Sequence, residues 1–166
     1  VITGVSSSRF TAGSTGTVTV TNGKFNWTLT ETSSGSTNWN LVVTNFDNDA
    51  PTLSSSSPSD NATEVAINAN IVLTFSEAVD AESGNITIKR TSDDSTIETI
   101  DVTGAKVSGS GSTAITINPS TDLTADIDYY ILIDATAFDD TNGNSYAGIS
   151  STTALNFSTK PGEVFN

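Results

Sequence analysis

The chain contains no cysteine, no histidine and no methionine among its 166 residues. Without thiolate, imidazole or thioether groups, the only side-chain ligands it offers a metal ion are oxygens. The same absences exclude a disulfide framework and the Ser-His-Asp and Cys-His nucleophilic sites. Paired carboxylates could hydrolyse glycosides only if they were held in a cleft, and here the acidic residues fall on predicted turns. We therefore predict a protein that is not an enzyme.

Basic residues are also scarce, since six Lys and Arg face nineteen Asp and Glu, which leaves a formal net charge of −13. Such a charge repels nucleic acid and anionic membrane surfaces, and it favours hard cations. No apolar run approaches the roughly 20 residues that span a bilayer, and residues 1–5 lack the basic start and apolar segment of a signal peptide. We expect a soluble piece of a larger protein, with no nucleic-acid partner and no membrane insertion.

The first 46 residues alternate apolar and polar side chains in three segments, 16–21, 24–30 and 38–43. This period of two is typical of strands, and Asn22-Gly23 between the first two segments predicts a tight hairpin. Three strands bury one face poorly. The segment 1–46 is therefore either a small antiparallel β-unit or part of a larger module.

After Pro51 the turn residues recur at regular intervals and separate seven predicted strands. These strands are 52–56, 70–75, 85–90, 96–102, 114–118, 128–134 and 154–159. Seven short strands fit an all-β, immunoglobulin-like antiparallel β-sandwich. We predict a linker at 47–51, the sandwich at 52–160 and a tail at 161–166.

Acidic and amide side chains should converge at one end of this sandwich. The first strand begins at the end where the second finishes, and the connections after the second and sixth strands lie at that same end. The candidate ligands are Asp47, Asn48, Asp49, Glu77, Asp80, Asp139, Asp140, Asn142 and Asn144. Calcium takes six to eight oxygens, mostly from loops, so calcium is the predicted ion.

Ordinary turn chemistry is the alternative explanation for these residues. Asp140, Asn142 and Asn144 stand at alternate positions, as in an EF-hand loop, but Gly143 is misplaced and Ser151 stands where the closing Glu belongs. The loop is not an EF-hand, and its composition also suits a turn. For the segment 47–49, the alternative is a solvated linker.

Several motifs together resemble a known family. They are Asp49-Ala50-Pro51, Ser57-Pro58, the segment 70–77 with its Phe-Ser-Glu end, Tyr129-Tyr130 and the Asp-rich segment 138–144. In this combination, residues 47–159 resemble bacterial immunoglobulin-like domains of surface-layer proteins and of giant calcium-dependent adhesins of the repeats-in-toxin type. The segment 47–51 is also similar to the calcium-binding linker of cadherins.

This resemblance implies a secreted or cell-surface module in which neighbouring immunoglobulin-like modules of the same chain are the partners. Its role would be that of a calcium-rigidified spacer. A ligand-binding module for a carbohydrate or peptide is the alternative, and only Trp27, Trp39, Tyr146 or Phe165 could supply its exposed aromatic patch. A noncatalytic accessory domain of a secreted hydrolase shares the same fold.

Overall fold

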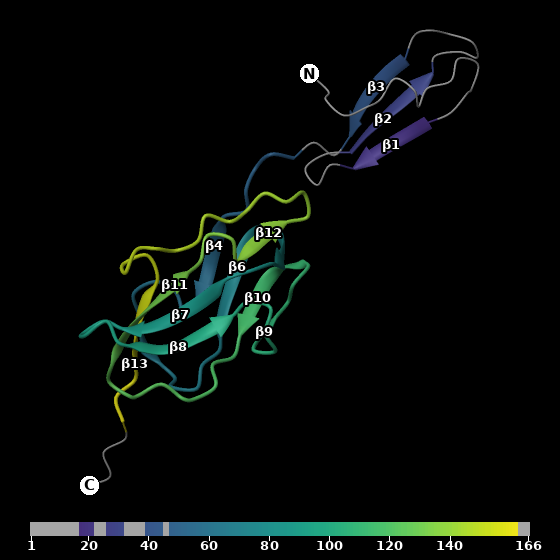
Figure 1. Ribbon diagram of the computed structural model, residues 1–166. Coiled ribbons are helices and arrows are strands. Elements are labelled where there is room, and N and C mark those ends of the chain that lie inside the picture. The colour runs from purple at the N-terminus through teal and green to yellow at the C-terminus, as the bar shows by residue number, and fades with distance from the viewer. Residues whose placement is uncertain (1–16, 22–25, 32–38, 45–46, 163–166) are drawn as a thin grey trace. The chain divides into compact units, whose positions relative to one another are not determined.

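The computed structural model describes residues 17–21, 26–31, 39–44 and 47–162, and these residues form thirteen strands and no helix (Figure 1). The chain divides into two compact units, Val1–Asn48 and Asp49–Asn166. The strands are β1 (Thr17–Thr21), β2 (Asn26–Glu31), β3 (Trp39–Thr44), β4 (Leu53–Ser57), β5 (Ala62–Val65), β6 (Ile71–Ala81), β7 (Asn85–Arg90), β8 (Thr96–Asp101), β9 (Val107–Ser108), β10 (Ser112–Ile117), β11 (Asp128–Ile133), β12 (Phe138–Asp140) and β13 (Asn156–Thr159).

The first unit contains an antiparallel sheet in the order β1-β2-β3. Trp27 of β2 lies opposite Val20 on one side and Val43 on the other. The predicted hairpin at Asn22-Gly23 lies outside the described residues, although the two strands that flank it do pair.

The second unit is a β-sandwich of two five-stranded sheets, which confirms the predicted fold class (Figure 1). One sheet has the order β12-β6-β10-β9, with β4 also paired to β6, and the other has the order β5-β13-β11-β7-β8. All pairs are antiparallel except β5 with β13, which are parallel. In the first sheet, β6 is the long central strand.

The core of the sandwich follows from the period-two alternation of its strands. Ile86 and Ile88 of β7 and Ile131 of β11 are fully buried between the sheets. Phe75 of β6 packs against Phe138 of β12, with ring centroids 5.3 Å apart. Burying these apolar side chains is the main favourable contribution to folding. The contact between Phe75 and Phe138 also holds β6 and β12 together near the candidate metal centre.

The carboxylate of Glu98 links its own sheet to residues that flank β9 and β10 of the other sheet. Glu98 lies on the edge strand β8, and it accepts an ion-pair hydrogen bond from Lys106, the residue that precedes β9. It also accepts hydrogen bonds of 2.9 Å from the backbone nitrogen and the hydroxyl of Ser120. Burial alone would raise the pKa of Glu98, but the hydrogen bonds from Lys106 and Ser120 outweigh burial and lower that pKa.

The structure adds three short strands that the alternation pattern did not predict, namely β5, β9 and β12. It also extends β6 from Phe75 to Ala81. Glu77, Asp80, Asp139 and Asp140, which were predicted on connections, therefore lie on paired strands. The reason is that β6 pairs with β12 beyond Phe75, through Val79 to Ala81.

Candidate metal centre

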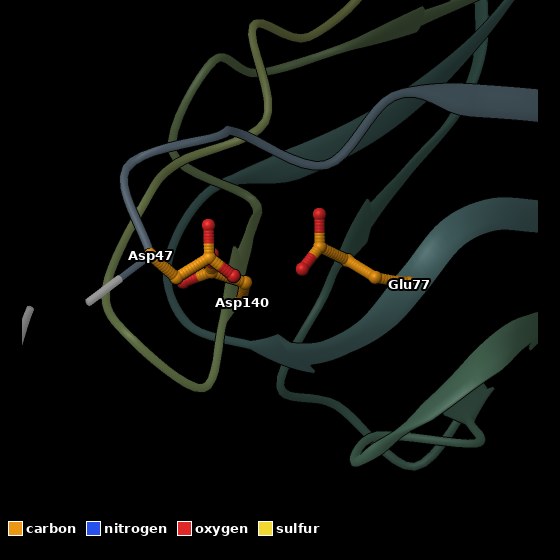
Figure 2. A group of neighbouring side chains, drawn as sticks. All are labelled: Asp47, Glu77 and Asp140. Carbon is orange, nitrogen blue, oxygen red and sulfur yellow. The ribbon is translucent and has the colours of Figure 1, made fainter. Parts of the chain in front are cut away.

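Three carboxylates meet at one end of the sandwich. Asp47, Glu77 and Asp140 each offer an oxygen atom, and the three oxygens lie within 4.8 Å of one another. Figure 2 shows the three side chains pointing toward a common point from the segment before β4, from β6 and from β12. Asp140 is buried, whereas Asp47 and Glu77 are partly exposed. We call these three residues the carboxylate triad.

An irregularity in β6 places Glu77. In the register of β6 with β10, Thr74 lies opposite Ala114 and Val79 lies opposite Ser112. Between these two pairs, β6 advances by five residues while β10 advances by only two. On its other side, β6 pairs with β4 up to Phe75 and with β12 from Val79 onward, so its partner changes between these two residues. Bulges of this kind redirect side chains and are frequent beside functional sites. Glu77 lies in the stretch where both changes occur.

Asp140 is the hydrogen-bonding centre of the turn that follows β12. Its exposed fraction is 4%. Its Oδ1 accepts hydrogen bonds from the backbone nitrogens of Asn142, at 2.8 Å, and of Asn144, at 2.7 Å. Its Oδ2 accepts a third bond from the side-chain amide of Asn144, at 2.8 Å. A buried carboxylate needs such donors to offset the loss of water, so the turn is built around this one side chain.

The backbone of the same turn closes in two further hydrogen bonds. The nitrogen of Gly143 donates to the carbonyl of Asp140 at 3.1 Å, and the nitrogen of Asp140 donates to the carbonyl of Asn144 at 3.0 Å. Gly143 adopts a φ of 79°, a left-handed conformation that favours glycine. Ordinary turn chemistry, the alternative considered for this loop, therefore accounts for much of its Asp and Asn content. Asp140 differs because it also joins the carboxylate triad.

The other predicted residues lie outside the triad. Asn48 and Asp49 are exposed on the segment that leads into β4. Asp80 and Asp139 lie opposite each other on β6 and β12, and Asp80 accepts a hydrogen bond of 3.3 Å from the Ser110 hydroxyl. Oδ1 of Asp139 is buried and has no hydrogen-bond partner among the described residues. Of the nine predicted residues, the structure thus gathers Asp47, Glu77 and Asp140, with Asn142 and Asn144 bonded to Asp140.

The donor set of the triad suits a hard divalent cation. Carboxylate oxygens are ligands that Ca²⁺ and Mg²⁺ prefer, and Ca²⁺ accepts six to eight oxygens in flexible geometry. Three carboxylates from three separate segments supply part of that number, and backbone carbonyls and water commonly complete it. With no histidine or cysteine in the chain, the residues fit calcium better than they fit zinc or copper.

Tyr146 belongs to the core. Only 7% of it is exposed, and its ring meets that of Phe75 edge to face at 5.2 Å. Burial also raises the pKa of its hydroxyl. Trp27, Trp39 and Phe165, the other aromatics named for a ligand-binding surface, lie where side chains are not described.

Within the described part of the chain, we find no helix of the length and apolarity needed to cross a membrane.

Comparisons with known proteins gave a family match and matches to solved structures. A family model described as a bacterial Ig-like domain matches residues 47–159. The crystal structure of CopC from Methylosinus trichosporium OB3b is 15% identical, with a TM-score of 0.48, and the match covers 70% of this chain and 99% of CopC. The S-layer protein rSbsC is 18% identical, with a TM-score of 0.43, over 68% of this chain and 14% of that protein. No curated protein matches the chain.

Proposed function

The chain belongs to the bacterial Ig-like domain family, and we propose that it is a calcium-binding structural module of a protein on the outside of a bacterial cell. In this proposal, the ion is held by Asp47, Glu77 and Asp140, and the module acts as a stiffened spacer in a surface adhesin. The observation that carries the proposal is the convergence of three carboxylate oxygens within 4.8 Å.

Electrostatics gives the reason for a cation at this point. Two unit charges about 5 Å apart repel by on the order of 3 kcal/mol at an effective dielectric constant of about 20. Three carboxylates at such separations disfavour the folded state. A divalent cation among them replaces repulsion with attraction, so its binding energy adds to the stability of the fold.

Calcium at the triad would also restrict the chain that enters the sandwich. Asp47 precedes β4 by six positions, whereas Glu77 and Asp140 lie on strands of the sandwich sheet. One ion bonded to all three residues would fasten the entering segment to β6 and to the end of β12. For a module in a row of modules, this is the point at which stiffness is useful.

A calcium titration of the whole chain tests the proposal. We expect saturable binding in the calorimeter, and Glu77→Gln should weaken it at least about tenfold, because a charged ligand becomes a neutral one. Glu82→Gln is the matched control. Glu82 is exposed one position beyond β6 and lies outside the triad, so this change should leave the dissociation constant within about twofold of the wild-type value.

Two results would contradict the proposal. One is the absence of saturable calcium binding at millimolar concentrations. The other is an equal loss of affinity in the Glu77 and Glu82 variants, because this would show a diffuse response to net charge in place of a site.

A further inference from the structure

We infer that Asn142 is a site of spontaneous covalent modification, at which the side-chain amide is converted to a carboxylate. Opening of the turn around Asp140 controls the rate of this reaction. The inference starts from the sequence Asn142-Gly143, which lies in the turn after β12. Glycine carries no β-carbon to hinder attack by its backbone nitrogen on the preceding side chain. Gly143 is exposed and Asn142 partly exposed, so water and hydroxide reach both residues.

The reaction needs only water. The backbone nitrogen of Gly143 loses its proton to hydroxide and attacks Cγ of Asn142, which forms a five-membered succinimide and releases ammonia. Water then adds to either carbonyl of the ring, and the ring opens to aspartate or to isoaspartate. The net change is the gain of one water and the loss of one ammonia, with no oxidant or reductant.

The closed turn opposes the first of these steps. The attacking nitrogen of Gly143 donates its proton to the carbonyl of Asp140 at 3.1 Å. The backbone nitrogen of Asn142 is held by Oδ1 of Asp140 at 2.8 Å. These bonds must break before Gly143 can turn toward the side chain of Asn142. Conversion therefore proceeds from the open form of the turn, and its rate reports the population of that form.

The product alters the same turn. Aspartate at position 142 places a second negative charge two residues from the buried Asp140. Isoaspartate inserts one additional methylene into the backbone between Asn142 and Gly143, which disturbs the bond from Gly143 to the Asp140 carbonyl. Either product changes the loop that supplies one carboxylate of the triad.

Calcium should slow the conversion, and this part of the inference rests on the proposed function. If opening of the turn releases the ion, free calcium at about ten times its dissociation constant lowers the open population about tenfold. The prediction is an approximately tenfold slower conversion of Asn142 in calcium than in chelator. The same dipeptide at Asn22-Gly23 is an internal reference outside the triad, and its rate should be equal in both conditions.

The experiment ages the whole chain in mildly alkaline buffer, with calcium or with chelator, and follows both dipeptides by digestion and mass spectrometry. Asn142→Gln is the control variant, because its longer side chain does not readily form the five-membered ring. A urea-unfolded sample gives the rate without the turn. We expect the order unfolded, chelator, calcium from fastest to slowest.

Failure of the inference and failure of the proposed function give different results. If Asn142 stays unmodified in chelator while Asn22 converts, or if it converts as fast folded as unfolded, the gated site is wrong, whatever calcium does. If Asn142 converts more slowly folded than unfolded, but at one rate in calcium and chelator, the modification site stands and the calcium link is overturned.

Discussion

Asp140→Ala is expected to lower the free energy of unfolding by about 2 kcal/mol or more, because each buried donor that loses its acceptor costs about 1–3 kcal/mol and two of the donors belong to the buried Asn144. Asp140 accepts three hydrogen bonds, from two backbone nitrogens and the side-chain amide of Asn144. Asn144 is itself only 4% exposed, so water cannot readily replace the lost acceptor. The measurement is urea unfolding of the whole chain in chelator, where no ion contributes.

Two further variants separate the causes of this loss. Asp139→Ala is the matched control, because its Oδ1 has no partner among the described residues and its carboxylate lies opposite that of Asp80. Like charges opposite each other destabilise a sheet, so this change should be neutral or slightly stabilising. Asp140→Asn keeps an acceptor oxygen but loses the charge, and it should retain more stability than Asp140→Ala while losing calcium binding. Equal effects of Asp139→Ala and Asp140→Ala would contradict the assigned role of Asp140.

Calcium is expected to stabilise the wild-type chain by about 2.7 kcal/mol when its free concentration is about 100 times the dissociation constant. For a domain of this size, that corresponds to a rise of roughly 10 °C in melting temperature. The effect of Glu77→Gln on the melting temperature should have opposite signs in chelator and in calcium. In chelator it removes one of three repelling charges and should melt at or above the wild-type temperature, whereas in calcium it should melt below.

Differential scanning calorimetry with calcium and with chelator measures this reversal. Glu82→Gln should follow the wild-type chain in both conditions, since Glu82 lies outside the triad. A wild-type melting temperature that does not respond to calcium would remove the basis for the proposed stiffening. If Glu77→Gln lowered the melting temperature equally in both conditions, Glu77 would have a purely structural role.

The sandwich could be predicted because its strands follow a simple rule. Strand β7 alternates the fully buried Ile86 and Ile88 with more exposed residues, and this alternation is visible in the sequence. The shared end of the sandwich could also be predicted, because antiparallel topology determines which connections meet. Asp47, Glu77 and Asp140 were therefore all among the predicted residues.

The details of the site depend on features that have no local signature. The irregular stretch of β6 around Glu77 arises from its pairing with β10, β4 and β12, and β12 itself is only three residues long. From the sequence, Asp80 and Asp139 look equivalent to Glu77 and Asp140, because all four are acidic residues on predicted connections. Only the register shows that Asp80 and Asp139 face each other and that Asp140 holds the turn.

The position of the ion is the central claim, and a crystal structure grown in calcium, with anomalous data, tests it most directly. We expect an anomalous peak among Asp47, Glu77 and Asp140, with ligand oxygens at about 2.3–2.6 Å. At a calcium concentration that saturates binding, a peak at another place, or none among these three carboxylates, would contradict the account.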